Sequence, residues 1–538
     1  MNARRIIQRV VSDSFPQATS FSTYLKEDIM KKKALMQFPH PFFSERPGWK
    51  WFILINVLIG ATMSALDVSI VNVAMPTLKT DFNTSMAVIE WVAMSYMLTL
   101  TVFLPFFGRL ADMLGRSKLY NMGFVIFTIG SLFCGMATSA AYIIAARVVQ
   151  AVGAGLLQAN SVALITQAFP ANERGKAIGI QGAVQAIAMA VGPFVGGILI
   201  SSVGWRSVFY INIPIGILGT LAGLLILPPN VKTAMKEKID YLGTAFFASG
   251  LAFLVLVFNE GVKLGWESPT ILIYGALAVI LISLFVITET RVKNPLIDLN
   301  LFKNVTFLIG NVTGMMSYYV LFAVLFLMPF YCEKVLDFSP ALTGSLLTPI
   351  PLAMAVVAPF AGYISDKYRS GTKLMTAGGM LVSAFACFAL LFLGSHAHII
   401  VLVAELVLLG VGMGMFTPPN NSAIMGSAPR EKLGLAGGIL NMMRSLGLIF
   451  GVDISGVIFT TLEHRYLARH GYHHVLHVFQ NGHIPLTMKD HAFLRGFVIV
   501  AAILMVMNLL ASLLSTINEV KEIDAEAAAA AKEFEAAV

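Results

Sequence analysis

Charged residues are scarce in this chain: Asp, Glu, Lys and Arg make up 12% of its 538 residues, against about 25% in a typical soluble domain. Hydrophobic residues make up 57%, and the mean hydropathy is +0.78. This composition excludes an ordinary soluble globular protein and indicates an integral membrane protein. The net charge of +8 does not indicate nucleic-acid binding, because the basic residues lie in short loops between apolar runs.

Cysteine is also rare, and the motifs of common enzymes are missing. The three cysteines, Cys134, Cys332 and Cys387, lie in or at the end of apolar runs without metal-ligand spacing, so we expect small buried side chains and no disulfide. The sequence contains no G-x-x-x-x-G-K-[ST], G-x-S-x-G or H-E-x-x-H, which argues against a P-loop nucleotide site, a serine hydrolase and a zinc protease. We therefore predict neither an enzyme nor a bound cofactor.

Long apolar runs dominate what is present. A membrane-spanning helix needs about 20 mostly apolar residues, and fourteen runs approach that length. We place them near residues 52–76, 87–107, 119–138, 141–168, 175–200, 206–227, 240–260, 269–289, 305–331, 340–365, 373–394, 398–420, 434–462 and 492–515. The spacing predicts an all-α membrane protein in which two six-helix bundles flank an inserted helix pair.

The same spacing suggests domain boundaries. We expect bundles at residues 51–228 and 301–515, separated by a two-helix linker at 229–300. We expect a basic cytoplasmic extension at 1–50 that is not a cleavable signal peptide, and an Ala/Glu-rich tail at 516–538. Most of the 37 Lys and Arg residues fall in the segments on the same side as the termini. This asymmetry predicts that both termini are cytoplasmic.

A weak internal repeat supports two related halves. GRLADMLGRSK (Gly108–Lys118) follows the second predicted span, and GYISDKYRSGTK (Gly362–Lys373) follows the second span of the later set. Both carry Gly-x-x-x-Asp, ending in Asp112 and Asp366, and then basic residues. Repeats of this kind place a substrate site between the two halves of a transporter.

Two charges lie within the apolar runs of the first half. By helical rise, Asp67 lies ~22 Å above the predicted cytoplasmic start of its span, and Arg147 lies ~9 Å below the outer start of a span that runs the opposite way. In a hydrocarbon core about 30 Å thick these depths nearly coincide. We expect the two to pair, either as a switch that protonation of Asp67 breaks or as a static structural ion pair.

Four motifs resemble one family. LDVSIVNVAMP (Leu66–Pro76), the loop from Gly108, and IIAARVVQAVGAG (Ile143–Gly155) are similar to first-helix, loop and fourth-helix signatures of the major facilitator superfamily, and specifically of its fourteen-spanner drug:proton antiporters (the EmrB/QacA subfamily). The loop matches at Gly108, Asp112, Gly115 and Arg116, although Met113 replaces a usual arginine. The fifth span resembles the antiporter motif at Gly179, Gly192, Pro193, Gly196 and Gly197.

The resemblance implies a major facilitator fold and export of lipophilic compounds by alternating access, driven by the proton gradient. It implies that Asp67 and Arg147 couple protons, that Asp112 and Arg116 form a cytoplasmic latch, and that the Gly192–Pro193 element flexes. The expected location is the inner (plasma) membrane. The expected partners are protons, lipophilic and by hypothesis cationic small molecules, and the lipid bilayer; a periplasmic adaptor protein and outer-membrane channel stay open.

Candidates for the substrate cavity come from both halves. Glu405, Asp453 and Arg444 are charged residues within spans of the second half. Either carboxylate could attract a cation, carry a second proton or simply form an interhelical hydrogen bond. Among the aromatic residues we predict that Trp91, Tyr96, Tyr318 and Tyr319 line the cavity.

Seven of the ten histidines lie between the last two spans: His464, His470, His473, His474, His477, His483 and His491. Their i,i+4 pairs allow a metal site, but we favour a solvated outer loop that gains charge in acid. Two rival functions also stay open. One is a transporter of a single physiological solute, such as a lipid, siderophore or metabolite, and the other is a membrane receptor or scaffold that transports nothing.

Overall fold

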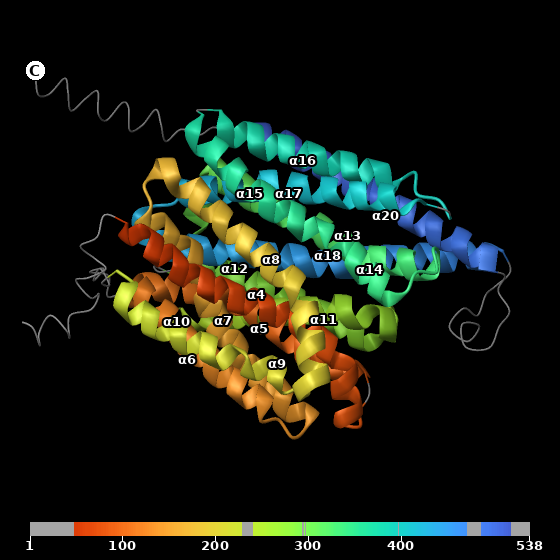
Figure 1. Cartoon of the computed structure of the whole chain (residues 1–538), viewed down its shortest axis with the longest axis horizontal. Helices are drawn as coiled ribbons and strands as arrows, with labels where there is room; N and C mark the ends of the chain where they lie inside the picture. Colours follow the sequence, from red (N-terminus) through yellow and green to blue (C-terminus); the bar gives the residue numbers. More distant parts are fainter. Residues whose placement is uncertain are drawn as a thin grey trace, which may run out of the picture.

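The computed structural model describes residues 48–84, 86–228, 240–292, 295, 297–368, 370–395, 397–470 and 486–517. Within these ranges it contains helices and no strands, and most helices lie side by side along the long axis of the molecule (Figure 1). Most of the predicted basic extension, most of the His-rich loop and nearly all of the C-terminal tail lie outside the described residues.

The first half of the described chain contains seven helices, two of which form one broken span. They are α4 (Trp49–Asp81), α5 (Met86–Leu114), α6 (Arg116–Gly135), α7 (Ala140–Ala168), α8 (Ala171–Val203), α9 (Ser207–Tyr210) and α10 (Asn212–Ile226). The middle pair is α11 (Tyr241–Leu264) and α12 (Pro269–Arg291).

The second half begins with a short 3-10 helix and, like the first half, contains six spans. Its elements are η1 (Leu299–Lys303), α13 (Val305–Lys334), α14 (Pro340–Leu347), α15 (Pro349–Lys367), α16 (Gly371–Leu390), α17 (Ile399–Ser427), η2 (Arg430–Lys432), α18 (Leu433–Arg469) and α20 (Leu486–Ile517). A proline at the first position of α15 marks the break from α14.

Thirteen helical stretches of the described chain are long and apolar enough to cross a membrane. Six precede the middle pair and six follow it. The exception among our fourteen predicted spans is α11, whose apolar stretch covers only Leu242–Phe258. The all-α membrane architecture is therefore confirmed, whereas the count of fourteen spans is not.

Each half packs as a helical bundle (Figure 1), and one large cluster of buried apolar side chains lies mainly in each half. In the first bundle α6 and α5 pack along α7, and α8 packs along α4. In the second, α15 and α16 pack along α17, α13 packs along α18, and α20 packs along α16. The core of the first bundle also takes in the first turns of α18, including Leu433 and Leu440. The beginning of α18 therefore belongs to the seam between the bundles.

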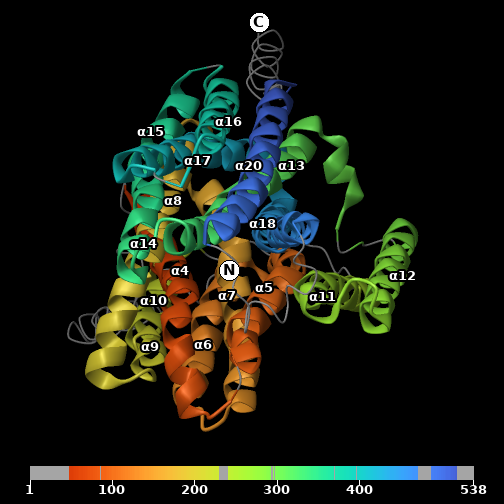
Figure 2. The ribbon, with the colours of Figure 1, turned by 90° about the vertical axis from the view of Figure 1, so that its right-hand side faces the viewer.

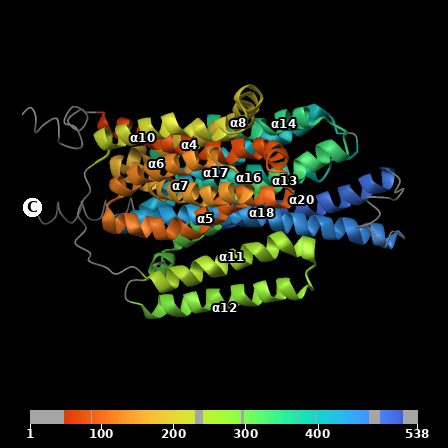
Figure 3. The ribbon, with the colours of Figure 1, turned by 90° about the horizontal axis from the view of Figure 1, so that it is seen from below.

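Two long helix pairs form most of this seam: α5 with α18, and α8 with α15. The inserted pair lies beside only one of them. Of the two inserted helices, α11 contacts both α5 and α18, and the Phe258 and Phe450 rings lie 5.7 Å apart. The other inserted helix, α12, stands farther out and packs on α11 (Figures 2 and 3). The insertion thus lies against the α5–α18 side of the seam and not against the α8–α15 side.

Candidate functional site

The buried charges of the first bundle form an ion pair. Asp67 on α4 is 0% exposed, and Arg147 on α7 is 1% exposed. Arg147 Nη1 lies 2.6 Å from Asp67 Oδ2. The two residues are 80 positions apart in the chain, and antiparallel spans bring them to the same depth, as the rise per residue predicts.

Amide side chains complete the surroundings of this pair. Gln150 and Asn212 each donate to Asp67 Oδ1, at 2.8 and 3.1 Å. Gln150 also accepts from Arg147 Nη1 at 2.7 Å and donates to Ser131 Oγ at 2.7 Å. Four helices of one bundle, α4, α6, α7 and α10, therefore contribute to a single polar cluster in an apolar interior.

Arg147 is held from its remaining sides by α5. Its Nε donates to the Val92 carbonyl oxygen at 3.0 Å, and the guanidinium lies 4.1 Å from the ring centroid of Tyr96.

Asp67 accepts hydrogen bonds from three partners, an arrangement suited to an ionised carboxylate rather than to the protonated acid. A proton delivered to Asp67 would remove its charge and weaken the attraction to Arg147. The geometry thus supports a charge switch, and it is equally that of a structural ion pair.

Sequence reasoning missed part of this cluster. The sequence identifies Gln150 only as a match to the fourth-helix signature and singles out neither Asn212 nor Ser131. The available signal was periodicity: Gln150 lies one turn after Arg147, on the same face of α7. Asn212 lies at the start of α10, and only the packing of the helices brings it to Asp67.

Asp112 lies where the two bundles meet at the predicted cytoplasmic end. Its Oδ1 pairs with Arg116 Nη2 at 2.8 Å. Its two oxygens also accept from the backbone N–H groups of Gly434 and Leu435, both at 2.8 Å. These N–H groups lie in the first turn of α18, so the carboxylate caps a helix of the other bundle and complements its dipole.

The turn between α5 and α6 depends on Gly115, which adopts φ +102°, a value that a residue with a side chain rarely adopts.

The internal repeat produces a second contact of the same kind. Asp366 on α15 accepts from the backbone N–H groups of Gly175 and Lys176, at 3.0 and 2.9 Å. These two residues lie in the first turns of α8, which belongs to the other bundle. The two carboxylates of the repeat therefore each hold the N-terminal part of a helix across the seam. We call Asp112, Asp366 and their partners the double latch.

Close backbone contacts accompany the double latch. A Cβ atom on Gly108 would lie 2.2 Å from the Gly434 carbonyl oxygen, and one on Gly362 would lie 2.2 Å from that of Gly175. No side chain can occupy that space without moving a helix backbone. The two seam contacts thus close the predicted cytoplasmic end of the molecule.

We expect Gly362→Ala to open this end. The added methyl group meets backbone rather than a flexible side chain, and overpacking of this kind costs about 1–3 kcal/mol, enough to shift the open-to-closed ratio about tenfold. Spin labels at the exposed positions Lys118 and Lys373, in different bundles, should report longer distances. Gly197→Ala is the matched control, because a Cβ atom there meets nothing within 4 Å. Unchanged distances in Gly362→Ala would contradict a closed seam at this contact.

The glycines of the fifth span divide between two neighbours. A Cβ atom on Gly192 would lie 1.8 Å from Ser69 Oγ, and one on Gly196 would lie 2.8 Å from Ile70, so both glycines permit close packing of α8 on α4. Gly179 approaches Ala358 of α15 across the seam instead. Two motif residues make no such contact in this conformation: Gly197 has open space beside it, and Pro193 lies on an exposed face of α8.

The aromatic residues predicted to line a cavity have different surroundings. Tyr96 is fully buried beneath Arg147 and belongs to the ion-pair cluster. Tyr319 is 8% exposed, and its hydroxyl accepts from Ser455 Oγ at 3.2 Å. Tyr318 and Trp91 are half-buried. In this conformation the four residues therefore do not form a single wall.

The carboxylates of the second half are separate from the ion-pair cluster. Glu405 on α17 is 7% exposed, and Asp453 on α18 is half-buried. In the described part of the chain neither forms an ion pair or a hydrogen bond. They are titratable groups of the second bundle that protein side chains leave uncompensated.

A polar path crosses from the first bundle to the second at mid-depth. Gln158 on α7 donates to Ser64 Oγ at 2.8 Å, and its backbone carbonyl accepts from Asn441 on α18 at 2.9 Å. One turn later Arg444 donates to Asn441 Oδ1 at 3.4 Å, and its guanidinium lies 5.2 Å from the centroid of the Tyr318 ring. Ser64 lies one turn before Asp67 on α4, so the path begins next to the ion pair.

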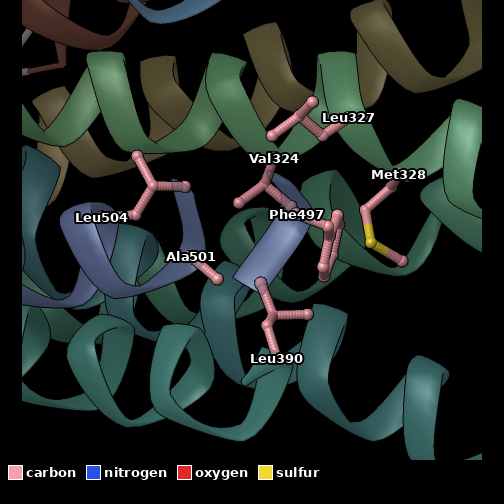
Figure 4. Close-up of a pocket in the computed structure, with 7 residues that line it drawn as sticks. All are labelled: Val324, Leu327, Met328, Leu390, Phe497, Ala501 and Leu504. Atoms are coloured by element: carbon pink, nitrogen blue, oxygen red, sulfur yellow. The ribbon is translucent and has the colours of Figure 1, made fainter. Parts of the chain in front are cut away.

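A pocket elsewhere in the molecule has no chemistry of its own. It is a small cavity of about 10 Å³ and lies within the second bundle, between α13, α16 and α20 (Figure 4). Its lining is apolar throughout: Val324, Leu327, Met328, Leu390, Phe497, Ala501 and Leu504. None of the predicted cavity residues lines it. Among the described residues no group of three or more His, Cys, Asp and Glu could hold a metal ion. The two predicted histidine pairs, His470/His474 and His473/His477, are not tested by this, because His473, His474 and His477 lie outside the described residues.

Two related helical halves, latched together by equivalent carboxylates and carrying a buried charge cluster, define a membrane transporter with internal repeats. The chain belongs to the Major Facilitator Superfamily, whose family model matches residues 57–452. It is accordingly a transporter and not an enzyme.

Named relatives and solved structures agree with this assignment. The chain is 40% identical over 402 residues to the riboflavin transporter RibZ of Clostridioides difficile (strain 630), covering 75% of this chain and 86% of that protein. It is 32% identical over 406 residues to the multidrug resistance protein Stp of Mycobacterium tuberculosis (strain CDC 1551 / Oshkosh), covering 75% of each. The crystal structure of the human organic anion transporter MFSD10 superposes with a TM-score of 0.59 at 14% identity, over 87% of this chain and 100% of that one.

Proposed function

We propose that this chain is a proton-coupled exporter of lipophilic small molecules that works by alternating access. The observation that carries the proposal is the Asp67–Arg147 pair, an ion pair buried inside the first bundle. In the proposed cycle a proton replaces the arginine as the partner of the carboxylate. Buried charges in spanning helices are costly and usually functional. The described conformation is closed at one end, so transport requires the double latch to open.

Export rather than uptake is supported by two lines of argument. The fifth span carries the Gly192–Pro193 motif typical of antiporters, and relatives such as Stp are named for multidrug resistance. We assign the chain to the fourteen-spanner drug:proton antiporters, with α11 as the shortest span. Both termini are then cytoplasmic and the protein lies in the inner (plasma) membrane. The charge distribution and the motifs support this topology; an adaptor protein and outer-membrane channel have no support in the structure.

The second candidate is a transporter of one physiological solute that uses the same machinery. A specific finding favours it: RibZ, at 40% identity, is named a riboflavin transporter. In that case the chain would move riboflavin or another compact aromatic solute and would ignore most dyes. The fold and the buried pair suit both candidates, so substrate range is what separates them.

The test is transport by the purified full-length chain in proteoliposomes. An imposed pH gradient should drive uphill movement of ethidium and of a lipophilic acid, and an ionophore that collapses the gradient should stop both. If no gradient drives any of a broad dye panel or riboflavin, proton coupling is wrong. If only riboflavin moves, the second candidate replaces the first.

A further inference from the structure

We propose that Arg444, Asn441, Gln158 and Tyr318 form a subsite, at the meeting of the two bundles, for lipophilic organic anions. This inference rests on the proposed transport function and adds the charge of the cargo. An anionic substrate is the opposite of the cationic substrate that Glu405 and Asp453 suggest.

The packing of the first turns of α18 sets the position of Arg444. On α18, Gly437 and Gly438 pack against backbone atoms of α7 and α5. One turn later Asn441 makes the hydrogen bond to Gln158, and the next turn presents Arg444. By helical rise Arg444 lies ~17 Å from the start of α18, near the middle of a hydrocarbon core about 30 Å thick. Arg444 is thus the first charged side chain of α18 beyond the closed seam.

The positive charge of Arg444 has few partners within the described chain. A guanidinium keeps its proton in proteins and offers five N–H donors. The structure uses one of them, in a long contact to Asn441 at 3.4 Å, and adds a cation–π contact to Tyr318. No carboxylate of the described chain pairs with it. Arg147, by contrast, is fully buried and bonded to Asp67, Gln150 and Val92. Arg444 is half-buried and has donors to spare.

A cation at this depth needs a partner. An uncompensated charge in the middle of the membrane is expensive, and such groups usually face a pathway that supplies water or a counter-ion. Carboxylate, sulfonate and phosphate groups match the fork of a guanidinium and bind it in a bidentate manner. A ligand with one such group would supply the missing negative charge.

The surroundings indicate what else the ligand carries. The Tyr318 ring stacks on Phe322 at a centroid distance of 6.4 Å, which makes an aromatic wall beside the guanidinium. The Gln158 side chain is half-buried on the opposite bundle and can bond a polar substituent. A planar aromatic body with one acidic group fits these neighbours.

Asp453 does not compete for this place. It lies nine residues after Arg444 on the same helix, which corresponds to about 13 Å along the axis and roughly half a turn around it. The two side chains therefore leave α18 on opposite faces. A cation attracted by Asp453 would occupy a different region from the ligand of Arg444.

The experiment measures binding without any gradient, so that failure of proton coupling does not affect it. The full-length chain in nanodiscs is titrated with three aromatic acids and their methyl esters: coumarin-3-carboxylate, 1-naphthoate and 4-biphenylcarboxylate. We expect wild type to bind at least one acid about tenfold more tightly than its ester, because a hydrogen-bonded charge pair is lost in the ester. Arg444→Gln should remove this preference, and Arg444→Lys should keep part of it.

Two controls make the outcome decisive. Asp453→Asn, on the opposite face of α18, should retain the preference for acids. Size-exclusion chromatography checks the fold of Arg444→Gln, and should that variant misfold, Arg444→Lys and wild type carry the test. The proposal is overturned if wild type binds no acid better than its ester, or if a folded Arg444→Gln keeps the preference. Preferred binding of ethidium over every acid would support cationic cargo instead.

Discussion

Replacing Asp67 with Asn is expected to abolish uphill transport driven by a pH gradient. Asn keeps the size of the side chain and the oxygen that accepts from Gln150 and Asn212. It has the charge of a protonated Asp67, but it can neither release a proton nor attract Arg147 as an anion. The variant should therefore behave as if Asp67 were permanently protonated, and it should not carry out the steps of transport that need release of the proton. Gradient-driven accumulation in proteoliposomes should fall to the level of protein-free vesicles.

Substrate-for-substrate exchange separates lost coupling from lost folding. Exchange without a gradient needs the bundles to move but needs no release of the proton, so Asp67→Asn should retain it. Asp81→Asn is the matched control, because Asp81 ends the same helix, is 44% exposed and lies outside the ion-pair cluster. Its contacts are an ion pair with Arg206 at 3.5 Å and a hydrogen bond from Trp205 Nε1 at 2.9 Å, which the oxygen of Asn can still accept. That variant should transport normally. Uphill transport that survives in Asp67→Asn would remove Asp67 from the coupling mechanism.

The sequence predicts the partnership of Asp67 with Arg147 from their common depth and from the cost of leaving either charge unpaired in the membrane. Depth in a membrane helix is set by counting residues from the predicted start of the span. The same applies to Asp112 and Asp366, whose places in the repeat put them at one end of the molecule. Positions along the helix axes were therefore predictable for the principal charges.

The rotation of each helix about its own axis could not be predicted from the sequence. Whether Tyr96 faces a cavity or lies beneath Arg147 depends on the rotation of α5, which an apolar sequence on all sides does not encode. The partners Asn212 and Gln150 depend on helix packing in the same way. The count of fourteen spans is not confirmed, because the apolar stretch of α11 covers only Leu242–Phe258 and length gives a weak signal there.

Replacing Arg147 with Met is expected to be more damaging to stability than any other single change considered. It leaves the Asp67 carboxylate buried without its cation, and breaking a buried pair by removing one partner costs about 3–5 kcal/mol. Neutralising both residues is different, since a buried pair replaced by groups of similar size is often neutral for stability. The double variant Asp67→Asn/Arg147→Met should therefore regain most of the lost stability. SDS-induced unfolding followed by circular dichroism measures both variants.

The double variant also decides between a switch and a structural ion pair. A purely structural pair predicts that restored stability restores transport, whereas a coupling pair predicts a stable protein that cannot move substrate uphill. We expect the second result. Asp81→Asn provides the scale for an exposed pair and should cost at most about 1 kcal/mol, because Arg206 and Asp81 are each 44% exposed and Asn keeps an oxygen that can accept from Trp205. If the double variant is as unstable as Arg147→Met alone, the loss comes from packing around the guanidinium and not from the unpaired charge.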